Sequence, residues 1–123
     1  MIKFTNLQIS AIIRAGLELS YADGKIDKTE SIVIAATLFG FVGANKEEGE
    51  QILSSAESMN SSSMLTILSL MNEDQKKFVC GYLSTIIKAD GKVDDSEIKS
   101  WKLILRLAEL PAMSIEEARK YFV

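Results

Sequence analysis

The stretch ADGKIDKTE at residues 22–30 recurs almost unchanged as ADGKVDDSE at residues 89–97. The two phrases share Ala, Asp, Gly, Lys, Asp and Glu, so six of their nine positions are identical. Apolar residues also correspond outside the phrases, because Leu38 aligns with Leu105 at the same spacing. The sequence therefore predicts an internal duplication.

Helices are predicted throughout the chain, because apolar residues recur at spacings of three and four and only one proline interrupts the 123 residues. Each unit is expected to hold a helix, an acidic turn and two further helices. The predicted fold is all-α, a compact bundle of about seven helices in a single domain. Its parts are repeat one at about 5–59, a connector helix at about 62–71 and repeat two at about 72–123.

Polar residues mark the predicted helix starts, because a side-chain oxygen can satisfy the free backbone N–H groups of a first turn. The expected capping residues are Thr5 with Gln8, Asn45, Asn72 with Gln75, and Ser114. The helix that follows Asp27 is apolar nearly all round, which predicts burial on several sides. Two such units can cover each other's apolar faces by pseudo-twofold packing.

Composition excludes several classes of function. The net charge is −3, so the chain offers no general attraction to a phosphate backbone, and no nucleic-acid partner is expected. Without histidine, the lone Cys80 cannot form a cysteine–histidine catalytic pair or a thiolate–imidazole zinc site, and a buried core position is predicted for it. No apolar stretch is long enough to cross a bilayer, and the first ten residues lack secretory-signal features, so a cytoplasmic location is expected.

Each acidic phrase brings at least three carboxylates within eight residues, where they repel one another unless a cation is present. Oxygen ligands alone favour Ca²⁺, Mg²⁺ or Mn²⁺. The spacing of Gly24, Ile26 and Glu30 matches the second half of an EF-hand loop, but Leu19 and Tyr21 stand where its first carboxylates should be. The candidate metal ligands are Asp23, Asp27 and Glu30 in the first phrase and Asp90, Asp94 and Glu97 in the second.

A purely structural explanation of the same residues stays open. Asp27 and Glu30 have the spacing of a capping box, as do Asp94 and Glu97, and an Asp-Gly pair favours a turn by itself. The sequence also leaves open whether the two acidic turns lie next to each other.

The two phrases resemble the hallmark of the tellurite resistance protein TerB-like family. That hallmark is an Ala-Asp-Gly turn, an aliphatic residue two positions after the Gly and a Glu four positions later, as at Ala22 to Glu30 and Ala89 to Glu97. The resemblance implies an all-helical domain with an internal duplication that binds a divalent metal through these acidic positions. It also implies a role in tellurite or other chemical stress and a protein partner, in some members a membrane-associated one.

Together these features predict a non-enzymatic cytoplasmic module that binds a divalent cation and a protein partner. No organic cofactor is expected. The alternative is a structural helical interaction domain in which the acidic turns are only helix caps and no metal is bound. Catalysis has the least support, because no histidine, nucleophile elbow or phosphate-binding glycine loop accompanies the carboxylates.

Overall fold

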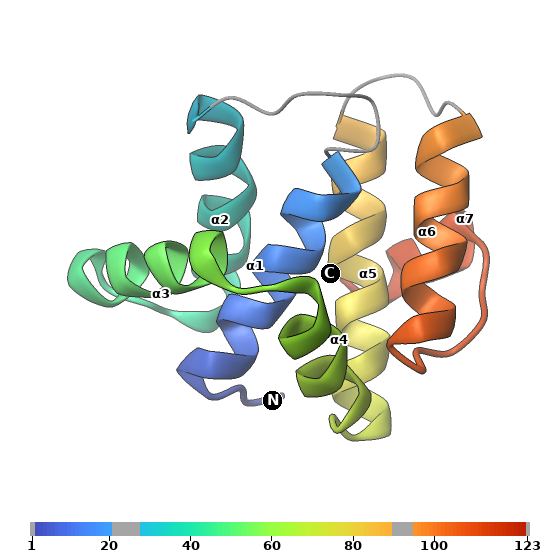
Figure 1. Ribbon diagram of the computed structural model, residues 1–123, viewed down its shortest axis with the longest axis horizontal. Helices are drawn as coiled ribbons and strands as arrows, with labels where there is room; N and C mark the ends of the chain where they lie inside the picture. The colour runs from blue at the N-terminus through green and yellow to red at the C-terminus, as the bar shows by residue number, and fades with distance from the viewer. Residues whose placement is uncertain (1, 21–27, 90–94, 123) are drawn as a thin grey trace.

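The computed structural model describes residues 2–20, 28–89 and 95–122, with the side chains of 28–31 and 88–89 excepted. These residues form an all-α bundle of seven α-helices and contain no strand, which confirms the predicted fold class (Figure 1). The helices are α1 (Asn6–Ser20), α2 (Lys28–Val42), α3 (Lys46–Ser58), α4 (Ser61–Ser69), α5 (Glu73–Ala89), α6 (Asp95–Leu107) and α7 (Ile115–Ala118), followed by the 3-10 helix η2 (Arg119–Tyr121). Their order agrees with two units joined by a connector, while the duplication itself stays a prediction.

The predicted capping residues occupy the helix starts. Asn45 and the Glu48 side chain form a capping box at the start of α3, with the Glu48 N–H 2.9 Å from Asn45 Oδ1. The Ser114 hydroxyl accepts from the Glu117 N–H at 3.2 Å. Reciprocal bonds also join Thr5 with Gln8 and Asn72 with Gln75. These four helix starts, of α1, α3, α5 and α7, therefore follow from local side-chain chemistry.

The connector helix differs slightly from its predicted range of 62–71. It covers Ser61–Ser69, because Asn60 accepts a hydrogen bond from the Ser63 N–H at 2.7 Å and starts the helix earlier. The C-terminal end of α6 also precedes Pro111 by several residues. There Glu109 has a φ of 56°, and the Leu110 N–H bonds back to the Leu105 carbonyl at 2.8 Å, which closes the helix.

The central element of the bundle is α1, which contacts α2, α3, α4, α5 and α6 (Figure 1). Nine of its fifteen residues are buried. Polar bonds fix its position as well: the buried Ser10 hydroxyl donates to the Ile52 carbonyl of α3 at 3.1 Å, and Ser61 of α4 donates to the Glu18 carboxylate at 2.7 Å. The core therefore surrounds α1, and the other helices pack around it.

The prediction that the second helix is buried on several sides is wrong. Ile34, Ala35 and Leu38 are buried, but the opposite face of α2 is in solvent. The sequence pattern misled because α2 lies at the edge of the bundle, where α1, α3 and Tyr82 of α5 contact it and much of its outer surface stays in solvent. The exposed residues of α2 are Ile32, Val33, Ala36, Thr37, Gly40 and Phe41.

The C-terminal segment packs through aromatic rings against α5 and against Phe41 of α2. The Phe122 ring lies 4.1 Å from that of Phe41 and 5.3 Å from that of Phe78, between ring centroids. A Cβ added at Gly81 would stand 2.8 Å from the Phe122 backbone nitrogen, so only glycine allows this approach. None of the described helices combines the length and apolar character needed to cross a membrane.

Candidate functional site

Helix ends flank the part of each acidic phrase that lies outside the described residues. Helix α1 ends at Ser20 and α2 begins at Lys28, and in the second unit α5 ends at Ala89 and α6 begins at Asp95. The ends of α1 and α5 and the starts of α2 and α6 all lie at the same end of the molecule (Figure 1). The helix ends that flank both phrases are therefore gathered on one side.

Most of the predicted metal ligands fall outside the described part of the chain. The backbone of Glu30 lies in the first turn of α2, but its side chain is not described. Glu97, in the first turn of α6, is fully described. The ligands outside the described residues are Asp23, Asp27, Asp90 and Asp94. Among the residues that are described, no three acidic or thiol side chains gather as a metal site, so the site stays a prediction.

Glu97 is the one candidate ligand whose side chain is described; it is buried, with 4% of its surface exposed, and it takes part in a polar interaction. Removing a carboxylate from water costs several kcal/mol unless hydrogen bonds or a positive charge replace the lost hydration. A helix cap does not require this burial. Glu48, which closes the capping box of α3, and Glu117, which accepts a hydrogen bond from the Ser114 hydroxyl at the start of α7, are both exposed.

Close packing holds the helices of the two units together near this end of the bundle. A Cβ at Gly16 of α1 would stand 2.6 Å from Ile86 Cδ1 of α5 and 3.2 Å from Ile34 Cγ2 of α2. The buried Tyr82 hydroxyl of α5 donates a hydrogen bond to the Ile34 carbonyl. Burial raises the pKa of the Tyr82 phenol, so it stays a neutral donor. Three helices are thereby fixed at this point.

Cys80 occupies the core position predicted for it. Its side chain is fully buried on α5, and desolvation raises the pKa of the thiol to about 12. Because the thiolate and not the thiol is the nucleophile, this sulfur is unreactive near neutral pH. Cys80 therefore has a structural role in the core, and the carboxylates of the acidic phrases remain the candidate ligands.

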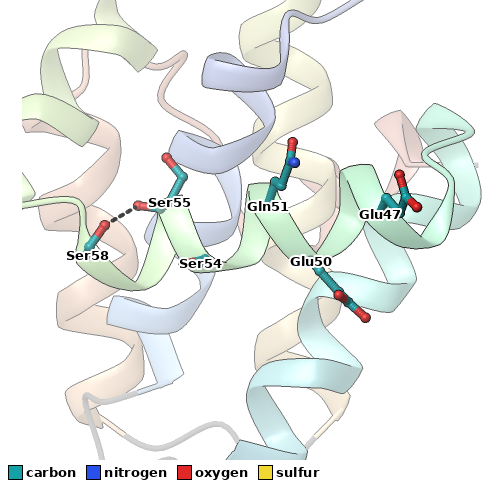
Figure 2. Close-up of a pocket in the computed structure, with 6 residues that line it drawn as sticks. All are labelled: Glu47, Glu50, Gln51, Ser54, Ser55 and Ser58. Carbon is teal, nitrogen blue, oxygen red and sulfur yellow. Dashed lines mark hydrogen bonds between the residues drawn. The ribbon is translucent and has the colours of Figure 1, made fainter.

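Two hollows lie on and beside α3. One, of about 540 Å³, is lined only by polar side chains of α3 itself, and Figure 2 shows them spread along a single helix, with Ser58 hydrogen-bonded to the Ser55 carbonyl. No second element encloses it, so it forms an open surface. The other, of about 520 Å³, lies between α2 and α3 and has mainly apolar walls. Sequence reasoning missed it, because it expected the apolar residues of α2 to be covered.

The fold and these features define the class of the protein as a compact all-α bundle. The chain is similar to the solved structure of the protein of unknown function PG1108 from Porphyromonas gingivalis W83. Its TM-score is 0.81, with 32% sequence identity over 98% of this chain and 90% of that chain. The chain therefore belongs to the same family as that protein. No protein-family model matches it, and no curated protein is similar.

Proposed function

We propose that the chain is a non-enzymatic cytoplasmic module that binds a divalent cation at its acidic turns and engages a protein partner. The observation that carries this proposal is the burial of Glu97 in the first turn of α6. The carboxylates at two other helix starts, Glu48 of α3 and Glu117 of α7, are by contrast exposed. A buried carboxylate that lies close to Asp90 and Asp94 in sequence adds to a concentration of negative charge, which a bound cation would relieve.

The ion would be a hard divalent cation. Carboxylate oxygen with backbone carbonyls and water suits Ca²⁺, Mg²⁺ or Mn²⁺, and the chain has no histidine for a zinc site. The proposed ligands are Asp23, Asp27 and Glu30 in one turn and Asp90, Asp94 and Glu97 in the other. A cation bound only by the folded chain stabilises it by about 2.7 kcal/mol when its free concentration is a hundred times the dissociation constant.

The second candidate function is a structural interaction domain in which the acidic turns are helix caps. The frequency of capping elsewhere in the chain favours it, since the starts of α1, α3, α4, α5 and α7 all carry side-chain caps. The exposed apolar face of α2 supports partner binding in either case. A link to tellurite or another chemical stress rests on the resemblance of the two acidic phrases to the TerB-like family.

Calorimetric titration separates the two candidates. Ca²⁺, Mg²⁺ and Mn²⁺ are titrated in turn into the wild-type chain and into the double variant Asp23→Asn/Asp90→Asn. A matched control carries Asp74→Asn, which removes an exposed carboxylate outside both phrases. Saturable binding in the wild type and control, lost or weakened at least about tenfold in the double variant, supports the metal site. If all three proteins bound the cations equally, or not at all, the result would favour the structural domain whose acidic turns are only helix caps.

A further inference from the structure

The groove between α2 and α3 combines apolar walls with an acidic rim. Phe39 and Leu53 line it from the two helices, and Ile32 beside them is 49% exposed. Glu50 and Glu57 stand on the α3 side of the groove, where neither carboxylate pairs with a cation among the described residues. Among the described residues that line the groove, the single cation is Lys46, in the first turn of α3. An apolar groove with an acidic rim fits an amphipathic helix that carries cations beside its apolar residues.

Helix α6 presents a surface of that kind. Leu103 and Leu107 lie one turn apart with 55% and 52% of their surfaces exposed. Lys99, Lys102 and Arg106 are exposed beside them, and none has an acidic partner among the described residues. The face is therefore apolar in its centre and basic along its edge.

The charges of the two surfaces have the same spacing. Glu50 and Glu57 are seven residues apart on α3, and Lys99 and Arg106 are seven residues apart on α6. Two helical turns separate the members of each pair, which corresponds to about 10.5 Å along either helix. Both cations can therefore approach both carboxylates at once when the two helices lie side by side.

The two surfaces belong to opposite ends of the molecule. Helices α2 and α3 lie at one end of its long axis and α6 at the other (Figure 1), so one copy cannot cover its own groove. A symmetric pairing of two grooves would bring acidic rims together, which is unfavourable. We propose that α6 of one copy docks in the α2–α3 groove of a second copy, so that the chains associate head to tail.

Head-to-tail contacts of this type use different surfaces on the two partners. Each added copy leaves one free groove and one free α6, so the assembly grows into a ring or an open chain and does not stop at a dimer. The association does not depend on a metal, because neither surface includes an acidic phrase. A failure of metal binding therefore leaves it intact, and the reverse also holds.

Sedimentation equilibrium over a concentration series tests this association with two variants. The groove variant carries Glu50→Lys and Glu57→Lys, and the helix variant carries Lys99→Glu and Arg106→Glu. The average mass of the wild type should rise with concentration, whereas each variant alone should associate at least about tenfold more weakly. An equimolar mixture of the two should recover association, because every reversed groove then meets a reversed helix.

All four positions are exposed, so the variants should keep the helical circular dichroism spectrum of the wild type. The milder pair Glu50→Gln/Glu57→Gln, with the separate variant Leu103→Ala, repeats the test if a reversed variant fails to fold. A control with Glu73→Lys and Glu116→Lys changes the net charge by the same amount as the groove variant. Both of its substitutions lie outside the groove, so it should associate like the wild type. A wild-type mass that stays monomeric at every concentration, or variants that associate as the wild type does, would overturn the proposal.

Discussion

The Gln75 side chain donates from Nε2 to Oε1 of Gln8 at a distance of 3.5 Å, and these two residues are 67 positions apart. Each closes the capping box at the start of its helix, Gln8 in α1 and Gln75 in α5. The same Gln75 nitrogen donates to the Lys3 carbonyl at 2.8 Å. The starts of α1 and α5 are thus joined directly through equivalent side chains.

The spacing of 67 is also the spacing that aligns Asp23 with Asp90. Helices α1 and α5 contact each other and run in the same direction (Figure 1). Contact between equivalent residues is expected where two copies of one unit pack about a pseudo-twofold axis. The capping contact therefore supports the predicted duplication from residues that lie outside the acidic phrases.

Gly81 should tolerate no side chain. A Cβ there would stand 2.8 Å from backbone atoms of Tyr121 and Phe122, which cannot rotate away. We expect Gly81→Ala to lower the free energy of unfolding in urea by about 1–3 kcal/mol. The control is Gly40→Ala in α2, where nothing lies within 4 Å and the gain in helix propensity should stabilise by about 0.5–1 kcal/mol. A stable Gly81→Ala variant would show that the C-terminal segment does not pack as described.

Phe122 should anchor the C-terminal segment. Its ring lies 5.6 Å from that of Tyr82, as well as close to those of Phe41 and Phe78. Phe122→Ala should lower the free energy of unfolding by about 2 kcal/mol, less than for a fully buried ring because Phe122 is half-buried. Tyr121→Ala is the comparison. That ring is exposed, with Lys77 Nζ 5.8 Å from its centroid, and its loss should cost about 1 kcal/mol or less. Equal losses would contradict the anchoring role.

The buried Cys80 predicts a loss of stability in alkali. Burial raises the pKa of its thiol from 9.0 to about 12, so the unfolded chain ionises at lower pH than the folded chain. The contribution of Cys80 is therefore complete below pH 9.0 and is lost as the pH rises toward about 12. Urea unfolding over this range should show a steeper decline for the wild type than for Cys80→Ala. If the free energy of unfolding fell equally with pH in both proteins, the Cys80 thiol would have the same pKa in the folded and unfolded chains.

Glu97 should be required for stabilisation of the fold by divalent cations, whereas a carboxylate that serves only as a helix cap should not be. With excess Ca²⁺, Mg²⁺ or Mn²⁺, the melting temperature of the wild type should rise, and Glu97→Gln should remove most of that rise. The matched variant Glu117→Gln changes an exposed carboxylate that accepts a hydrogen bond from the Ser114 hydroxyl at the start of α7. It should lower the melting temperature slightly and equally with and without the ion. The metal role of Glu97 would be refuted if Glu97→Gln retained the full wild-type response.

The helix starts could be predicted from sequence because capping is local. Asn45, Asn72 and Ser114 bond to backbone groups three residues away, so their roles do not depend on the rest of the fold. The exposed face of α2 could not be predicted, since a helix that is apolar all round looks the same whether its neighbours cover one side or several. The burial of Glu97 depends likewise on how α6 packs, and the phrase alone fits a cap as well as a ligand.

The most direct test of the central claim is a crystal of the protein grown with Mn²⁺, with anomalous scattering recorded at the manganese absorption edge. The account predicts an anomalous peak within coordination distance of the Glu97 carboxylate, shared with Asp90 or Asp94, and a matching peak at Asp23, Asp27 and Glu30. Crystals saturated with Mn²⁺ that showed no peak at either turn, with the Glu97 carboxylate closing only its own helix start, would contradict it.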